Sequence, residues 1–402
     1  MKVCIIGAGA SGLLCGGCIA SYGHDVTIFD GNEKAGKKIY ITGKGRCNFT
    51  NVCDNDEFLS NVVRGKKFLF SALNGFSSYD TLSFFSELGM EFVVERGNRA
   101  FPKSNKASDV TKALLKHCKD VKFSFNEAVK AVSKRGDAFA VKTAKSEHVF
   151  DAVVVATGGK SYEATGSTGF GYSVAKSLGH TIVDLKPALV PIVLNDKFVS
   201  SMEGLSLKNV ELHVQTDKNK YSQFGEMMFT DKGITGPIVL SMSSFINREH
   251  VKDIYIDLKP ALSEEQLDKR LLREFAEQSN KNLANVMKNL LPISLVEPFL
   301  KKIQLPNDKK CNSITLSERK NIICVLKRFT LSFNSLYNLN VGVVTSGGVD
   351  LNEVNPKTME SKKHKNLFFI GEVLDIDALT GGFNLQIAFS TAYACAKYFK
   401  EF

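Results

Sequence analysis

Three glycines near the start of the chain, Gly7, Gly9 and Gly12, have the spacing of a turn that binds a phosphate chain. In such a turn the first glycine permits the tight bend, and the second lets the backbone approach a pyrophosphate. The third lets the following helix pack closely against the preceding strand. That helix presents unpaired N–H groups and the positive end of its dipole to the phosphates. The spacing therefore indicates a dinucleotide site.

An acidic residue completes this pattern. Dinucleotide-binding units carry one about 20 residues beyond the glycines, where it accepts hydrogen bonds from ribose hydroxyls. Asp30 has that place, at the end of an alternating segment that we expect to be a strand (25–30). Residues 2–6 read as a buried strand and residues 12–22 as a helix, so the turn has its full context. A glycine turn without a ligand is the disfavoured alternative.

The end of the chain decides between NAD and FAD. Residues 367–370 form an apolar strand that ends in Gly371 and Glu372, which suits the ribityl and phosphate region of FAD. Residues 381–386 then open a final helix, 384–400, whose free N–H groups would face the flavin N1–C2=O edge. Negative charge collects there on reduction, and a helix N-terminus stabilises it. An NAD enzyme usually completes its nucleotide fold contiguously, so FAD is favoured.

These elements predict an α/β protein. We expect a Rossmann-type FAD-binding domain built from both chain ends, with an inserted β-rich domain and a small helical domain. Between the first strands and the insertion we expect a long functional loop, a helix with Ser108 as its N-cap, and a buried strand followed by Thr157–Gly159. The expected bounds are 31–55 for the loop, 80–88 and 108–118 for helices, 151–156 for that strand, 1–186 and 341–402 for the FAD-binding domain, 187–260 for the β-rich domain, and 261–340 for the helical domain.

Composition limits the classes of function. Lys and Arg number 52 against 42 Asp and Glu, a net charge of +10 that favours phosphorylated or polyanionic ligands. Nine scattered cysteines indicate reduced thiols and a cytoplasmic protein. The apolar stretch 3–20 is interrupted by glycines, so we expect a strand, turn and helix there and no signal peptide. We expect no membrane association.

Segments along nearly the whole chain together resemble the YhiN/BaiN-type flavoproteins. The most specific segment is Thr42–Asn48, with the sequence TGKGRCN. The other matching segments are Ile6–Gly12, Phe101–Pro102, Lys106–Val110, Ala156–Gly159, Thr165–Gly169, Pro187–Pro191, Gly233–Pro237, Thr345–Val349, Thr358–Ser361, Gly371–Asp375 and Gly381–Gln386. The family includes proteins described as 3-dehydro-bile acid Δ4,6-reductases and as aminoacetone oxidases. The resemblance implies FAD and a nucleotide domain with β-rich and helical parts.

Within this resemblance the loop that contains Arg46 and Cys47 would lie against the isoalloxazine ring. Arg46 could hold phosphate or a negative flavin edge, and both residues are candidates for catalysis, although a structural thiol is favoured for Cys47. We identify no general acid and expect no metal. The residues expected to bind FAD are Gly7, Ala8, Gly9, Ala10, Ser11, Gly12, Asp30, Lys38, Gly43, Gly45, Arg46, Cys47, Asn48, Val129, Ala156, Thr157, Gly158, Gly371, Glu372, Asp375, Gly382, Phe383, Asn384, Leu385 and Gln386.

For four other features of the sequence we favour a structural role over a functional one. Cys15 and Cys18 have C-x-x-C spacing on the first helix but more readily pack there than act in redox chemistry. His24 and His180 each follow a glycine at an expected helix end and favour the helix dipole. Residues 166–171 offer a second glycine turn, for NAD(P)H, without a following acidic residue. Lysines 362, 363 and 365 form a short basic run that suits a solvated loop.

The leading functional hypothesis is an FAD-dependent oxidoreductase that acts on a small organic substrate. The resemblance favours an NAD(P)H-linked reductase of an enone-type C=C bond, with an amine oxidase that produces hydrogen peroxide as the alternative. A third hypothesis is a flavoprotein that binds or modifies RNA, in line with the charge of +10. Because the lysines are spread along the chain without an aromatic-interleaved stripe, we do not expect nucleic acid as a partner. An NAD-only dehydrogenase is the remaining option.

Overall fold

The computed structural model describes residues 1–402, and it divides into two units. The first unit contains both ends of the chain, Met1–Ala188 and Asn338–Phe402, and the second contains Leu189–Tyr337. Each unit has its own cluster of buried apolar side chains, so each is organised around a separate core. No helix combines the length and the apolar character needed to cross a lipid bilayer.

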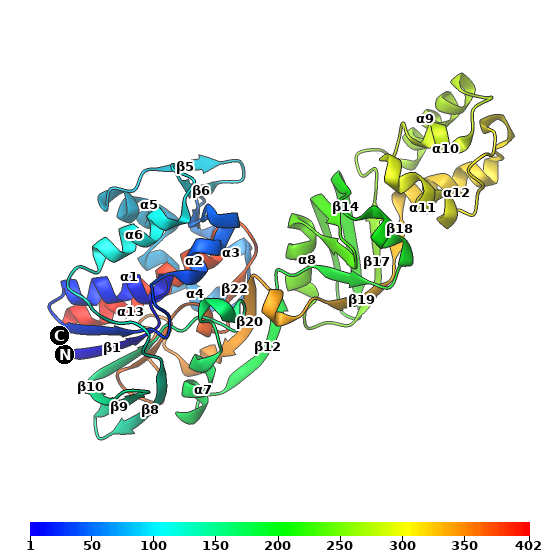
Figure 1. Cartoon of the computed structure of the whole chain (residues 1–402). Helices are drawn as coiled ribbons and strands as arrows, with labels where there is room; N and C mark the ends of the chain where they lie inside the picture. The colour runs from blue at the N-terminus through cyan, green and yellow to red at the C-terminus, as the bar shows by residue number, and fades with distance from the viewer. The chain divides into compact units, whose positions relative to one another are not determined.

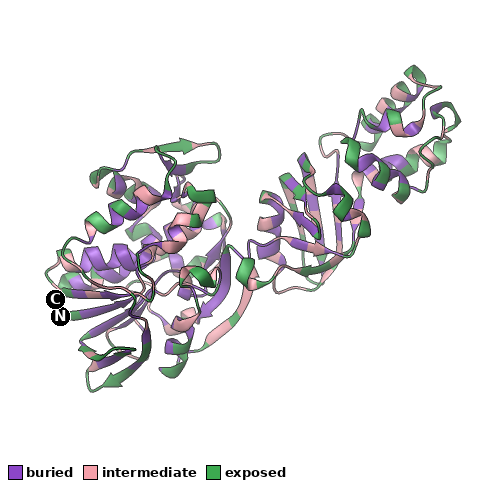
Figure 2. Ribbon diagram, viewed as in Figure 1, coloured by how far each residue is buried: buried purple, intermediate pink, exposed green.

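A five-stranded parallel sheet forms the centre of the first unit (Figure 1). The central strand β1 is an apolar run in which Val3, Cys4 and Ile5 are fully buried, as expected for a parallel sheet covered on both faces. Figure 2 shows the same burial along the strands of this sheet. The strands, in spatial order, are β21 (Leu367–Phe369), β11 (Ala152–Val155), β1 (Lys2–Ile6), β2 (Asp25–Phe29) and β7 (Lys122–Ser124).

The first and last helices of the chain pack against each other on this sheet. Helix α1 (Ala10–Ser21) follows β1, and helix α13 (Phe383–Tyr398) closes the chain. In Figure 1 the two helices, blue and red, lie side by side. Small residues on α1 also allow close packing against helix α6 (Ala107–His117): a Cβ built on Gly17 would lie 2.1 Å from Cδ2 of His117. Both chain ends therefore build one Rossmann-type domain, as the sequence predicts.

The remaining elements of the first unit surround this core. Six further helices, of which three contact α1 or α13, and four small antiparallel sheets complete the unit. The helices are α2 (Lys37–Ile41), α3 (Asn55–Ser60), α4 (Lys66–Gly75), α5 (Ser78–Glu87), α6 (Ala107–His117) and α7 (Phe170–Ser177). The sheets are β3 (Thr50–Asn51) with β6 (Arg99–Pro102) and β5 (Phe92–Glu95); β8 (Val129–Arg135) with β9 (Ala138–Thr143) and β10 (Glu147–Phe150); β12 (Ile182–Ala188) with β20 (Val344–Val349); and β4 (Val62–Arg64) with β22 (Asp377–Ala378).

The second unit contains a seven-stranded sheet followed by a group of helices. Its buried residues alternate along β14 and β15, so one face of the sheet packs on the core and the other faces solvent. In spatial order the strands are β18 (Phe329–Leu331), β17 (Val251–Asp257), β14 (Ser206–Thr216), β15 (Lys220–Phe229), β16 (Gly233–Thr235), β13 (Ile192–Leu194) and β19 (Phe333–Leu336). The helices are α8 (Pro237–Ile246), α9 (Glu264–Glu277), α10 (Leu283–Met287), α11 (Ile293–Lys302) and α12 (Leu316–Lys327).

Three local expectations differ from the structure. The segment 31–55 contains helix α2 and strand β3 in place of a continuous loop, because short elements are stabilised by tertiary packing that periodicity does not show. Ser108 is not the N-cap of α6, since the helix begins at Ala107 and Lys106 precedes it without a side-chain cap. Helix α8 lies within the region read as strands; Pro237 at its first position marks a helix start.

Candidate functional site

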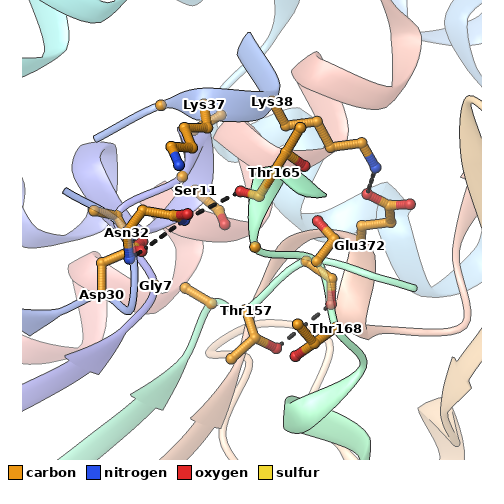
Figure 3. Close-up of a pocket in the computed structure, with 18 of the residues that line it drawn as sticks. Gly7, Ser11, Asp30, Asn32, Lys37, Lys38, Thr157, Thr165, Thr168 and Glu372 are labelled. Carbon is orange, nitrogen blue, oxygen red and sulfur yellow. Dashed lines mark hydrogen bonds and ion pairs between the residues drawn. The ribbon is translucent and has the colours of Figure 1, made fainter. Parts of the chain in front are cut away.

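A cavity of about 560 Å³ lies within the first unit. This volume falls within the roughly 300–1,000 Å³ of small-molecule and cofactor sites. Figure 3 shows part of its wall. The cavity is bordered by the β1–α1 turn, the ends of β2 and β11, helix α2, the turn before α7 and the first turn of α13. Segments from both ends of the chain therefore enclose one cavity.

The glycine turn has the geometry that phosphate binding requires. Gly7 has φ 111°, a backbone conformation that other residues rarely adopt. A Cβ built on Gly12 would lie 2.0 Å from the carbonyl oxygen of Gly7, so Gly12 serves the close packing of α1. A Cβ on Gly9 would meet no atom within 4 Å, and Gly9 begins α1 without a side-chain cap. The first N–H groups of α1 are therefore left for a ligand.

Asp30 lies at the end of β2, beside this turn. One of its carboxylate oxygens accepts a hydrogen bond from the Ala8 N–H at 2.8 Å. The other accepts from the backbone and side-chain N–H groups of Asn32, at 2.8 and 2.9 Å. Asn32 also donates to the Thr165 carbonyl oxygen at 3.1 Å, which ties the turn before α7 to this place (Figure 3). The carboxylate is thus held in the cavity wall, with one lone pair of Oδ2 left to accept from a ribose hydroxyl.

An ion pair crosses another part of the wall. The ammonium of Lys38 on α2 donates to Oε2 of Glu372 at 2.8 Å (Figure 3). It also donates to the Ser161 hydroxyl at 2.8 Å. Oε1 of Glu372 accepts from the Thr345 N–H at 2.9 Å. Both charged side chains are mostly buried, with 27% and 20% of their surface exposed. Such a pair needs these extra hydrogen bonds to offset its desolvation.

The N-terminal turn of α13 closes the cavity at a third place. Asn384 and Leu385 line it, and Asn384 exchanges hydrogen bonds with the backbone of Ala378 at 3.0 and 2.8 Å. Gly382 precedes the helix with φ 98°. A Cβ there would lie 2.9 Å from Oδ1 of Asn48, a buried oxygen that has no hydrogen-bond partner. Neither Asn48 nor Gly382 lines the cavity, so at this place Asn384 and Leu385 are the residues that border it.

The structure places the expected FAD-binding residues in two groups. Fourteen positions line the cavity: Gly7, Ala8, Gly9, Ala10, Ser11, Asp30, Lys38, Val129, Ala156, Thr157, Gly158, Glu372, Asn384 and Leu385. The others lie outside its wall: Gly12, Gly43, Gly45, Arg46, Cys47, Asn48, Gly371, Asp375, Gly382, Phe383 and Gln386. Several of the latter have other partners; Gln386, for example, is fully buried and accepts from the Thr50 hydroxyl.

The two catalytic candidates lie outside the cavity wall. The guanidinium of Arg46 pairs with Glu95, donates to Asn105 at 2.8 Å and stacks on Phe101 at 4.2 Å. Hydrogen bonding from Arg46 lowers the pKa of the Glu95 carboxyl. Cys47 is fully buried, and burial raises the pKa of its thiol to about 12. A thiol that stays protonated at neutral pH is a poor nucleophile, so the geometry favours the structural interpretation of Cys47.

Sequence reasoning missed part of the wall. The turn at 166–171, considered as a second nucleotide site, instead borders the same cavity through Gly166, Ser167, Thr168 and Phe170. Gly166 has φ 102°, and its glycine pattern was the available signal. The contacts of Val343, Val344 and Ile376 carry no sequence signal, because they depend on tertiary packing. Further lining residues that were not expected are Ile6, Phe29, Gly31, Asn32, Gly36, Lys37, Ile39, Thr42, Ala128, Lys130, Glu163, Ala164, Thr165, Ile387 and Ala388.

The remaining sequence features have structural roles. Cys15 and Cys18 are buried free thiols, and burial raises the pKa of Cys18 to about 12. His24 bonds to the N-terminal amine and to the Phe399 carbonyl. His180 is buried and bonds to the Ser361 hydroxyl at 2.8 Å. These four residues are absent from the cavity wall.

The cavity fits FAD on three of the observations above: an open glycine cradle, an α1 without a side-chain cap, and a carboxylate placed to accept from ribose. A model of the HI0933-like protein Rossmann domain matches residues 1–398. The chain belongs to the HI0933-like family. It is 32% identical over 98% of its length to a protein named ribosomal RNA dihydrouridine synthase from Haemophilus influenzae, 96% of which is covered.

Two further proteins are similar to this HI0933-like chain. It is 27% identical to a 3-dehydro-bile acid delta(4,6)-reductase from Clostridium scindens, over 98% of each chain. A 3-ketosteroid delta1-dehydrogenase from Sterolibacterium denitrificans shares its fold, with a TM-score of 0.51, 12% identity and 99% of each chain covered. The family and the cavity together make this protein an FAD-dependent oxidoreductase.

Proposed function

We propose that this protein reduces the C5=C6 double bond of a uridine in ribosomal RNA to give dihydrouridine. The observation that carries the proposal is the 32% identity to a ribosomal RNA dihydrouridine synthase, which extends over nearly the whole of both chains. The net charge of +10 suits a polyanionic substrate. This proposal reverses the preference for a small-molecule substrate drawn from the sequence.

The chemistry agrees with the enone-type reduction expected from the sequence. The C5=C6 bond of uracil is conjugated with the C4 carbonyl, so it is an α,β-unsaturated carbonyl within a ring. Its reduction takes two electrons and two protons, and we propose NAD(P)H as the source of the electrons. FAD, when bound, supplies hydride transfer between such a donor and such an acceptor.

The residues of this chain would bind and orient the cofactor. The N–H groups of α1 and the Asp30 carboxylate would hold the pyrophosphate and ribose. The first turn of α13, where Asn384 lines the cavity, would direct N–H groups toward a ring edge that gains negative charge. The Lys38–Glu372 pair would hold α2 against the C-terminal segment while the cofactor is bound. The first two groups would position the cofactor and stabilise its charge, and the Lys38–Glu372 pair would keep the cavity wall closed around it.

A direct assay tests the proposal. Ribosomal RNA from cells that lack dihydrouridine is incubated with the holoenzyme and NADPH, digested to nucleosides and analysed by mass spectrometry. We expect dihydrouridine at a defined position and a matching consumption of NADPH. Unmodified RNA, together with rapid NADPH consumption on adding a 3-oxo bile acid with a conjugated double bond, would contradict it.

That second outcome would support a different function. The 27% identity to the bile-acid reductase, over 98% of each chain, favours a small-molecule enone reductase as the second candidate. The amine-oxidase alternative predicts flavin reduction by a primary amine in the absence of NADPH, and hydrogen peroxide once air is admitted. Ribosomal RNA, a conjugated 3-oxo bile acid and a primary amine, tested in turn, therefore separate the RNA-modifying, enone-reducing and amine-oxidising functions.

A further inference from the structure

The second unit carries a surface that is rich in lysine and asparagine and nearly free of acids. It consists of two segments, 278–289 and 307–313, which we call the Lys–Asn surface. The segments run beside each other: the Cys311 N–H donates to the Lys281 carbonyl at 3.1 Å, and the Leu283 N–H donates to the Lys309 carbonyl at 2.7 Å. These hydrogen bonds bring together lysines and asparagines that are far apart in the sequence, so the sequence alone does not reveal the cluster.

Three of the four lysines of this surface have no anionic partner within the protein, and the fourth, Lys309, pairs with Glu318. Lys281, Lys288 and Lys310 are exposed, and each ammonium donates only to a neutral amide oxygen, at 3.1, 2.9 and 2.9 Å. Residues 278–289 contain neither Asp nor Glu, and residues 307–313 contain one acid, Asp308. Elsewhere in the unit lysines are neutralised, as where Lys301 pairs with Glu297 at 2.7 Å. Three positive charges are therefore left for an external anion.

Asparagine side chains supply neutral hydrogen-bonding groups between these charges. Asn280, Asn307 and Asn312 are exposed, and the Asn312 amide reaches Asn280 Oδ1 at 3.4 Å. Lysine charges together with asparagine amides are the usual donors to phosphate and sugar oxygens in complexes with nucleic acids. Exposed charges distributed over two adjacent segments suit a polymer with many phosphates.

We infer that the Lys–Asn surface binds the phosphodiester backbone of RNA, outside the cavity that holds FAD. This inference rests on the proposed function, because it supplies the contact that a large RNA substrate needs beyond one reacting uridine. The contacts are to phosphate, so they strengthen binding without selecting the base.

The test measures RNA binding by the full-length holoenzyme over a range of salt concentrations. The probe is a ribosomal RNA fragment that the wild-type enzyme modifies. The test variant is Lys281→Gln/Lys288→Gln/Lys310→Gln. The control removes three exposed lysines of the first unit, Lys67→Gln/Lys119→Gln/Lys142→Gln, and so causes the same change in net charge.

We expect the test variant to bind RNA at least 30-fold more weakly, and the control no more than threefold. Loss of three phosphate contacts should lower the slope of log K against log salt by about 2 to 3, from roughly 0.7 to 0.9 for each contact. The rate at which NADPH reduces the bound flavin, measured without RNA, should stay unchanged in both variants. Thermal unfolding should also be unchanged, since the replaced groups are solvated.

Each contrary outcome has a definite meaning. Equal losses in the test and control variants would overturn the inference while leaving the proposed function in place. If the wild-type protein neither binds nor modifies ribosomal RNA, the proposed function itself fails. Stronger binding to anionic phospholipid vesicles than to RNA, abolished in the test variant, would show that the surface serves a membrane and would also overturn it.

Discussion

The Lys38 ammonium lies 2.8 Å from Oε2 of Glu372, although the two residues are 334 positions apart in the chain. The pair joins helix α2, near the start of the chain, to the segment after β21, near its end. Both residues line the cavity, and Ser161 and Thr345 complete the hydrogen bonds around them. The wall of the FAD site therefore forms only when segments from both ends of the chain come together in the first unit.

Removing the cation from this pair should weaken the fold measurably. Lys38→Ala leaves a mostly buried Glu372 carboxylate without its charged partner, so we expect the free energy of unfolding to fall by about 1–3 kcal/mol. Lys37→Ala is the control, because Lys37 pairs with Glu33, whose side chain is 57% exposed; we expect a loss of no more than about 0.5 kcal/mol. Urea unfolding of the cofactor-free protein measures both. Equal losses would show that the buried pair has no special role.

The two glycines of the turn should separate folding from cofactor binding. In Gly12→Ala the new methyl would overlap the Gly7 carbonyl, and we expect a loss of about 1–3 kcal/mol in stability. In Gly9→Ala the methyl meets no protein atom, so the cofactor-free protein should keep its melting temperature. It should nevertheless lose FAD, because the methyl occupies the space of the pyrophosphate. Retained flavin absorbance in purified Gly9→Ala would contradict this placement.

The thiols should be unreactive in the folded protein, with one exception. Eight of the nine cysteines are buried, and Cys324 is exposed. Burial raises the pKa of Cys47 and of Cys53 to about 12, so their thiolates are scarce at neutral pH. We expect a thiol reagent to modify Cys324 in the native protein and all nine cysteines after denaturation. Cys47→Ala should keep the pH–activity profile; a lost acidic or basic limb would restore Cys47 as a candidate.

Stability should fall as the solution becomes mildly acidic. Burial lowers the pKa of His180 and of His117 below the ordinary value near 6.5. Between the lowered pKa and about 6.5 the unfolded chain binds more protons than the folded one, so acidification favours unfolding. The stabilisation is therefore present above about pH 6.5 and is lost as the pH falls below it.

A histidine variant checks this dependence. The free energy of unfolding of His180→Asn should vary less between about pH 7 and pH 5.5 than that of the wild type, because one linked proton is removed. His250→Asn is the control, since the side chain of His250 is 76% exposed. An unchanged slope in the His180 variant would mean that this residue does not titrate with unfolding.

Local patterns in the sequence were sufficient where the chemistry is local. The turn at Gly7–Gly12 and the acid at Asp30 belong to one strand–turn–helix–strand unit, whose geometry follows from neighbouring residues. The joining of the two chain ends in one domain was also predictable, because the strand at 367–369 and the helix after Gly382 have recognisable sequence patterns. These features were enough to identify FAD and the Rossmann-type fold.

Only the tertiary structure decided which of the remaining residues meet. Arg46 belongs to a conspicuous motif, yet Glu95 and Phe101 hold it away from the cavity. Asn32 and Ile376, which belong to no motif, line the cavity instead. The lysines at 281 and 310 read as scattered charges until hydrogen bonds between their segments place them together. The physical reason is that periodicity and turn chemistry record the interactions of near neighbours. Contacts between distant segments depend on packing of the whole core.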